Sequence, residues 1–110
     1  MRIEDLNESK VAEILTWLAT TDDQFAELKG GLESAEILRK RVRARAWLDA
    51  DGTGAERTAE AEVADDTQAA DDAYIAAKVA YEKLKARRER AALLIDTWRS
   101  LEASRRRVMA

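Results

Sequence analysis

The stretch Ala77–Val108, AKVAYEKLKARRERAALLIDTWRSLEASRRRV, has the residue spacing that decides the fold. Apolar residues recur there at helical intervals: Ala77, Ala80, Leu84, Ala91, Leu94, Trp98, Leu101 and Val108, with Tyr81 and Ile95 beside them. This is the pattern of one face of an α-helix, and the chain contains no proline that would interrupt it. The stretch therefore predicts a long helix with one apolar stripe, which is stable only when the stripe packs against another helix.

A second stretch near the N-terminus has the same property. Its apolar positions are Val11, Ile14, Leu15, Leu18, Phe25, Leu28, Leu32, Ala35, Leu38, Val42 and Ala46. Two long helices joined by a short connection form an antiparallel pair. We therefore predict an all-α fold, a long antiparallel helical hairpin that resembles a coiled coil. It comprises a single domain over residues 1–110, with a first helix over about 8–49, a connector containing a short helix over 50–65, and a second helix over about 66–108.

The ends and the middle of the first helix carry recognisable signals. Asp5 and Asn7 are N-cap residue types, and Asp5 with Glu8 fits a capping box. Gly30 and Gly31 lie in mid-helix, where each disfavours the helix by about 1 kcal/mol relative to alanine. Because the apolar pattern continues across the pair, we expect a continuous but bent helix there rather than a close approach of another backbone or a true break.

Charge is segregated along the chain and indicates how the two helices align. Residues 1–36 carry three basic and nine acidic side chains, residues 37–48 five basic and none acidic, residues 49–81 two basic and nine acidic, and residues 82–110 nine basic and four acidic. A hairpin that turns between 49 and 66 places Trp17 opposite Trp98 and Leu38 opposite Ala77. It also brings Arg39–Arg45 near Asp71 and Asp72, and Arg87–Arg90 near Asp22, Asp23 and Glu27. Complementary pairing of this kind favours the antiparallel register.

The composition excludes several classes of function. The chain has 110 residues and lacks cysteine and histidine, so zinc sites, disulfides and imidazole catalysis are excluded. Its serines stand in no context that activates a nucleophile, and a two-helix hairpin offers no pocket that excludes water. We expect no enzymatic activity and no cofactor. Because no apolar run is long enough for a membrane span or a signal peptide, we expect a cytoplasmic protein without membrane contact.

One set of basic residues toward the C-terminus is a candidate nucleic-acid site. Lys85, Arg88, Arg99 and Arg106 return to nearly the same helical face, and Arg105 and Arg107 extend the strip. In an oligomer such strips could bind the phosphates of single-stranded DNA with strong salt dependence. Alternatively, these side chains are the solvated face of a coiled coil.

The connector contains a look-alike of a calcium-binding loop. Asp49, Asp51, Thr53 and Glu60 occupy positions 1, 3, 5 and 12 of a twelve-residue loop, with a glycine at position 6. Glu56 stands at position 8, where an apolar residue belongs, and no second loop follows. Thr53 and Glu56 also fit a capping box that begins a short helix over 54–64. We therefore predict a structural connector and no metal.

The order of these parts resembles a known family. A long first helix, the connection RVRARAWLDADGTGAERTAEAEVADD and the segment Tyr81–Ser100, YEKLKARRERAALLIDTWRS, are similar to UvsY-like recombination mediators of phage and prophage recombination cassettes. The matching positions are Glu82, Leu84, Lys85, Ile95, Trp98 and Arg99. The resemblance implies a helical hairpin that assembles into an oligomer, binds single-stranded DNA and loads a recombinase in place of the single-strand-binding protein, in a bacterial host cell.

Two functions are therefore expected. The first is a phage-type recombination mediator or accessory protein that binds single-stranded DNA and a recombinase as an oligomer. The second is a protein-only coiled-coil adaptor, assembly chaperone or inhibitor that binds no nucleic acid. Both predict a homo-oligomer, because the apolar positions spread more widely than one seam requires. The surplus positions are Ile14, Leu15, Leu38, Leu93, Leu94 and Ile95.

Overall fold

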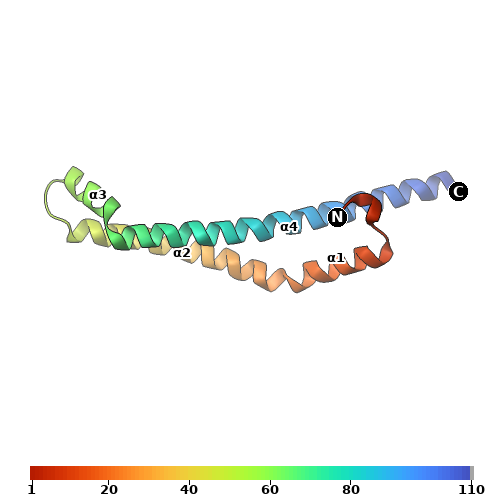
Figure 1. Cartoon of the computed structure of the whole chain (residues 1–110), viewed down its shortest axis with the longest axis horizontal. Helices are drawn as coiled ribbons and strands as arrows, with labels where there is room; N and C mark the ends of the chain where they lie inside the picture. Colours follow the sequence, from red (N-terminus) through yellow and green to blue (C-terminus); the bar gives the residue numbers. More distant parts are fainter. Residues whose placement is uncertain (110) are drawn as a thin grey trace. The chain divides into compact units, whose positions relative to one another are not determined.

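The computed structural model describes residues 1–109, which form helices joined by short irregular segments and contain no strand (Figure 1). The elements are a 3₁₀-helix η1 (Ile3–Asp5) and the α-helices α1 (Glu8–Thr20), α2 (Asp22–Asp49), α3 (Gly54–Val63) and α4 (Asp65–Met109). The predicted all-α helical hairpin with a short connecting helix is confirmed. None of these helices, within the described residues, combines the length and hydropathy that a bilayer crossing requires.

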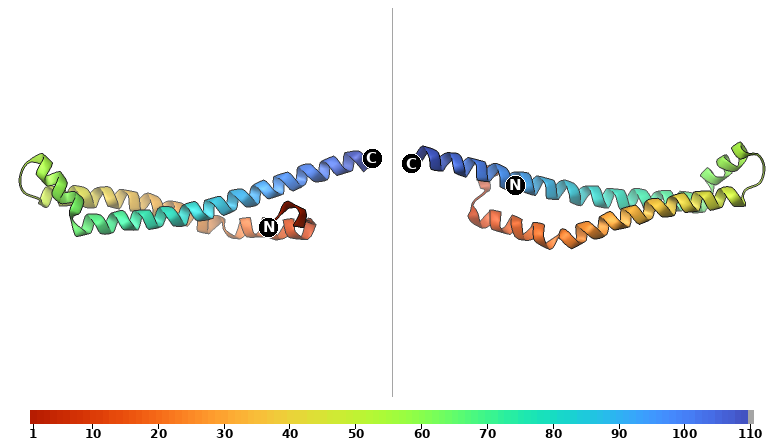
Figure 2. Two further views of the ribbon diagram at one scale, coloured as in Figure 1. Left: turned by 45° about the horizontal axis from the view of Figure 1, so that its top comes forward. Right: turned by 180° about the vertical axis from the view of Figure 1, so that it is seen from behind.

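The chain divides into two compact units. Unit 1 contains Met1–Phe25 together with the chain from Lys83 onward, so α1 lies opposite the second half of α4. Unit 2 is Ala26–Glu82, in which most of α2 lies beside the first half of α4 and α3 forms the turn between them (Figures 1 and 2). The site residues below are described unit by unit.

The helices meet along a seam of residues that alternate at steps of three and four. On α1 and α2 the seam residues are Val11, Ile14, Leu18, Thr21, Phe25, Leu28, Leu32, Ala35, Arg39, Val42 and Ala46. On α4 they are Thr67, Ala70, Tyr74, Ala77, Tyr81, Leu84, Arg88, Ala91, Ile95, Trp98 and Glu102. None of them is exposed, and the unbroken 3–4 alternation is the heptad pattern of a coiled coil.

The predicted stripe is wrong at several positions, because polar residues occupy seam places. Leu15 and Leu38 are exposed, and Arg39 takes the place expected of Leu38. On α4 the predicted positions Ala77, Leu84, Ala91 and Trp98 lie in the seam, but Tyr81, Ile95 and Glu102 take the places expected of Ala80, Leu94 and Leu101. Ala80, Leu101 and Val108 are exposed. Leu38 is 54% exposed, so it does not occupy the seam position opposite Ala77 that was predicted for it. Trp17 and Trp98 are both half-buried, and their mutual contact stays a prediction.

The first helix is interrupted at a position where the sequence has neither proline nor glycine. The prediction of one helix over 8–49 is wrong at Thr21, which separates α1 from α2. By contrast, α2 continues through Gly30 and Gly31, where both residues keep helical geometry. A Cβ atom added at either glycine would meet nothing within 4 Å, so no other described part of the same chain approaches the backbone closely there.

The helix ends follow their capping residues. Asn7 is the N-cap of α1, and its side chain accepts a 2.9 Å hydrogen bond from Lys10 N–H. The capping box predicted at Asp5 is wrong, because Asp5 belongs to η1 and accepts from Arg2 N–H instead. Thr53 caps α3 as predicted, accepting from Glu56 N–H at 3.2 Å. The turn before it depends on Gly52, whose φ of 104° is a backbone conformation that glycine adopts without strain.

Candidate functional site

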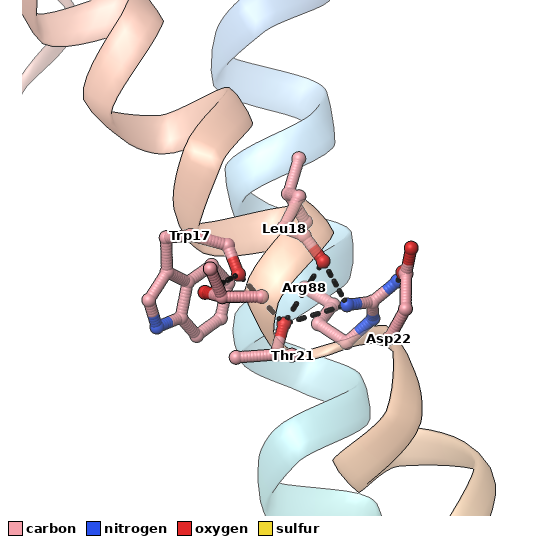
Figure 3. Close-up of polar contacts among 6 residues, drawn as sticks. Trp17, Leu18, Thr21, Asp22 and Arg88 are labelled. Atoms are coloured by element: carbon pink, nitrogen blue, oxygen red, sulfur yellow. Dashed lines mark hydrogen bonds and ion pairs between the residues drawn. The ribbon is translucent and has the colours of Figure 1, made fainter.

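The junction between α1 and α2 is built around the side chain of Arg88 (Figure 3). Its Nη1 donates hydrogen bonds to the main-chain oxygen of Leu18 at 2.8 Å and to Thr21 Oγ1 at 2.6 Å. Its Nη2 pairs with Asp22 Oδ1 at 2.6 Å, and the guanidinium lies 5.1 Å from the centre of the Phe25 ring. The Arg88 side chain is only 20% exposed, so it acts as a polar member of the seam.

Arg88 accounts for the helix break at Thr21. In an unbroken helix the Leu18 oxygen would accept from Asp22 N–H, but no such bond is present among the described residues. The oxygen accepts from Arg88 instead, while Thr21 Oγ1 donates to the oxygen of Trp17 at 2.9 Å. Insertion of a side chain into the backbone ladder is a known cause of helix kinks. The helix dipoles favour the same arrangement, because the positive charge of Arg88 lies at the C-terminus of α1 and the negative charge of Asp22 lies in the first turn of α2.

A second arginine in the seam has a similar environment in unit 2. Arg39 of α2 lies over the Tyr74 ring of α4 at 4.6 Å, and its Nε is 3.3 Å from Asp71 Oδ1. Arg43 Nη2 pairs with the other oxygen of the same carboxylate at 3.1 Å. Cation–π contact and ion pairing thus hold Arg39 at a position where a coiled coil normally places an apolar residue.

The two arginine sites are related by an internal repeat. The sequence DDQF at 22–25 corresponds to DDAY at 71–74, and in each case a seam arginine follows the aromatic residue by fourteen positions. Residues 22–41 and 71–90, offset by 49 positions, are identical at six of twenty places. Each repeat contributes the aspartate and aromatic residue of one site and the arginine of the other. We refer to these two sites as the arginine clamps.

The clamps change the interpretation of the predicted basic strip. The prediction that Arg88 belongs to an exposed basic strip or to a solvated face is wrong, because its side chain bonds Leu18, Thr21 and Asp22 across the seam. Lys85 is half-buried and already has an interaction partner, and Arg105 pairs with Glu102 at 2.8 Å. The remaining members, Arg99, Arg106 and Arg107, are exposed and form no ion pair with another described residue. The predicted pairing of the basic segment 39–45 with Asp71 is confirmed by the contacts of Arg39 and Arg43.

The calcium look-alike does not assemble its oxygen ligands. Thr53 caps α3, and Asp49 lies 3.7 Å from Arg45. Asp49 and Glu60 do line one cleft of about 510 Å³ together with Asp65 and Asp66. However, no three carboxylates in residues 1–109 come close enough to hold one ion. Thr53 thus begins the predicted connecting helix, and the absence of calcium binding stays a prediction.

An apolar hollow of the surface lies between α2 and α3, in unit 2. It has a volume of about 550 Å³ and is lined by Lys40, Arg43, Ala44, Trp47, Leu48, Thr58, Ala61 and Glu62. Leu48 is 66% exposed, and the Trp47 ring is held by Arg57, whose guanidinium lies 5.1 Å from the ring centre. We refer to this hollow as the tip groove. Exposed apolar surface with a polar rim is characteristic of protein-binding sites.

Comparison with protein-family models, with curated proteins and with solved structures finds no match to this chain.

The tip groove was missed in the sequence because Trp47 and Leu48 follow directly after the seam residue Ala46. Counting apolar residues assigned this end of the helix to the hairpin seam alone. The sequence did contain one indication of the groove: the predicted connecting helix is too short to cover both Trp47 and Leu48. A segment of ten residues buries only Ala61 of its own side chains.

Proposed function

We propose that this chain is a non-catalytic helical adaptor that binds another protein through the tip groove. The observation that supports this proposal most directly is the exposure of Leu48 and Trp47 in a groove that Ala44 and Ala61 also line. The volume of the groove is sufficient for apolar side chains of a partner. An amphipathic helix that inserts apolar side chains into such a groove is a common mode of recognition. The rim carries charges of both signs, Lys40 and Arg43 on α2 and Glu62 on α3, which suits polar residues that flank the partner's apolar anchors.

The adaptor proposal is tested by crosslinking from the groove. A photoreactive benzoylphenylalanine at Leu48 should capture a specific protein in cells, whereas the same residue at Val79, an exposed position on α4, should not. The captured protein is then purified and titrated against the wild type and the Leu48→Glu and Val79→Glu variants. We expect Leu48→Glu to weaken binding at least about tenfold, corresponding to about 1.4 kcal/mol, and Val79→Glu to leave it unchanged. Equal affinity of the purified partner for wild type and Leu48→Glu would exclude the groove.

Self-association is part of this proposal. Large hydrophobic side chains remain exposed in both units, including Leu15, Leu93 and Leu101 in unit 1 and Ile37 and Ile75 in unit 2. Side-by-side packing of copies would cover some of this surface and leave the tip groove accessible.

A second candidate is the phage-type recombination mediator that binds single-stranded DNA and a recombinase in the bacterial cytoplasm. The exposure of Arg99, Arg106 and Arg107 supports it, because three cations without an ion pair to another described residue can contact phosphates. The burial of Arg88 reduces the strip and makes this candidate weaker than the adaptor.

The DNA proposal is tested with a fluorescent single-stranded oligonucleotide titrated at several salt concentrations. Arg99→Ala and Arg106→Ala should each reduce the slope of log affinity against log salt by about one unit. Arg41→Ala is the matched control, because Arg41 is an exposed arginine of unit 2. Absence of binding at low salt, or an equal effect of all three variants, would count against a DNA site on α4.

A further inference from the structure

The buried core of unit 1 is small for an independently stable helix pair. Among its described residues, the buried hydrophobic side chains are those of Val11, Leu84, Ala91 and Ile95. Helices of this length depend on packing of their apolar face for most of their stability. The unit therefore has more apolar surface to cover than its own seam covers.

The surplus lies along one flank of α4. Leu94, Leu101 and Val108 follow each other at intervals of seven, and Leu94 and Leu101 each come one position before a seam residue. The three therefore form a stripe parallel to the seam. Leu101 is 44% and Val108 87% exposed, and Leu94 is half-buried. Leu93 adjoins the stripe and is 66% exposed. We refer to Leu93, Leu94, Leu101 and Val108 as the flank stripe.

The same face of unit 1 includes Trp17 of α1. Seam residues come in pairs three positions apart, such as Leu18 with Thr21 and Ile95 with Trp98. In an antiparallel pair of helices, the residues that directly precede the first member of each pair lie on the same side of the seam. Trp17 and Leu94 both occupy this position. Asp22, which pairs with Arg88, lies on the side of the junction opposite Trp17 (Figure 3). The apolar face and the ion-paired face of unit 1 are therefore different.

The charges of unit 1 indicate what covers the apolar face. Residues 1–25 carry two basic and six acidic side chains, whereas residues 83–110 carry nine basic and three acidic. Two α4 helices facing each other would bring together two strongly basic segments, which repel. If a second copy places its acidic α1 over the basic α4 of the first copy, each pair of neighbouring helices consists of one α1 and one α4. Neighbouring helices then carry opposite net charges.

We propose that two copies of the chain pair through the flank stripe into a four-helix bundle, with α1 of each copy packed on α4 of the other. This inference names the surface for the self-association proposed above and rests on that proposal. The bundle buries Leu94, Leu101 and Trp17 from both copies between four helices. Such packing of helical hairpins supplies the second layer that one hairpin lacks.

Sedimentation velocity over a range of micromolar concentrations tests the proposal with the full chain. The wild type should form a dimer, and Leu101→Glu should weaken it at least about 30-fold, because a carboxylate would be buried at the centre of the interface. Val108→Glu is a second variant that cannot disturb the fold of one copy, since Val108 is 87% exposed, and it should also weaken the dimer. Val79→Glu is the control, because Val79 is an exposed apolar residue of unit 2, and it should leave the dimer unchanged. Circular dichroism verifies that each variant keeps its helices.

The outcomes separate the surface from the self-association itself. A wild-type chain that stays monomeric at high micromolar concentration overturns both. A wild-type dimer that Leu101→Glu and Val108→Glu leave intact overturns the flank stripe while self-association stands. Salt provides a further test, because pairing of α1 with a partner's α4 should weaken as salt screens the opposite charges. A dimer that tightens with salt would contradict this arrangement of helices.

Discussion

The Arg88 guanidinium donates a 2.8 Å hydrogen bond to the main-chain oxygen of Leu18, seventy residues earlier in the chain. This contact replaces the backbone hydrogen bond that would continue α1 into α2. One long-range cation thus both ends a helix and fixes how the second half of α4 aligns with α1 in unit 1. A buried polar group that determines register is a well-attested device in coiled coils.

The first prediction concerns that cation. Arg88→Met keeps the aliphatic stem but leaves the Leu18 oxygen and the Thr21 hydroxyl without their donor. We expect the free energy of unfolding, measured by urea denaturation, to fall by about 2 kcal/mol. Arg87→Met is the matched control, because Arg87 is exposed, and it should change stability by less than about 0.5 kcal/mol. Equal effects of the two substitutions would show that the junction does not depend on Arg88.

The second prediction compares neighbouring aspartates in the other arginine clamp. Asp71 is 32% exposed and contacts both Arg39 and Arg43, whereas Asp72 is exposed. Asp71→Ala should therefore destabilise the chain by about 1 kcal/mol, a modest figure because solvent screens a partly exposed pair. Asp72→Ala should be nearly neutral. Thermal melts of both variants at low and high salt provide the measurement, and a larger loss for Asp72→Ala would contradict the clamp.

The third prediction uses two buried threonines with opposite hydrogen-bonding states. Thr67 is fully buried, and its hydroxyl is without a hydrogen-bond partner in the described residues. Thr67→Val keeps the side-chain shape and removes that unpaired hydroxyl, so it should raise the free energy of unfolding by about 1 kcal/mol. Thr21→Val should lower it by a similar amount, because the Thr21 hydroxyl bonds both Arg88 and Trp17. Urea denaturation of both variants should give shifts of opposite sign, and shifts of the same sign would disprove the assignment.

The apolar pattern predicted the hairpin and most of the seam on α1 and α2. On α4 it was right at Ala77, Leu84, Ala91 and Trp98, but it was one residue away at the positions between them. On α1 and α2, Val11, Leu18 and Phe25 lie where helical spacing puts them. On α4, Tyr81, Arg88 and Glu102 occupy seam positions, whereas Ala80 and Leu101 are more apolar and are exposed. A count of hydrophobic residues cannot identify an arginine whose charge is satisfied across the seam.

The long-range contacts could have been found through the internal repeat rather than through hydropathy. DDQF and DDAY recur with an arginine at the same distance, and equivalent residues in an antiparallel pair meet each other's partners. Charge patterning did predict that Arg39–Arg45 approach Asp71 and that Arg88 approaches Asp22. It did not predict the Thr21 break, because that depends on a hydrogen bond to a main-chain oxygen, which no side-chain pattern encodes.

The fourth prediction is that calcium leaves stability unchanged. Ion binding to the folded state would raise the melting temperature in proportion to the logarithm of the ion concentration over its dissociation constant. Because no group of three carboxylates among the described residues is placed to hold an ion, and Thr53 caps α3, we expect melting curves in excess calcium and in chelator to coincide. Asp51→Ala serves as the control and should be equally insensitive. An upward shift of several degrees with calcium, lost in Asp51→Ala, would establish a site in the connector.

The last prediction concerns Gly30 and Gly31 in the middle of α2. Both are exposed, neither has a positive φ, and an added Cβ atom at either would meet nothing within 4 Å. Alanine at each position restricts the unfolded chain without a clash, so Gly30→Ala and Gly31→Ala should each raise the free energy of unfolding by about 1 kcal/mol. Gly52→Ala is the contrasting control, since its φ is 104° and an added Cβ would lie 2.7 Å from the Glu56 carboxylate, so this substitution should destabilise the chain. The three variants are compared by urea denaturation. If Gly30→Ala or Gly31→Ala destabilises the chain, the pair must serve a partner or a second copy that approaches the backbone of α2 closely, which would place an interface in unit 2 rather than on the flank stripe.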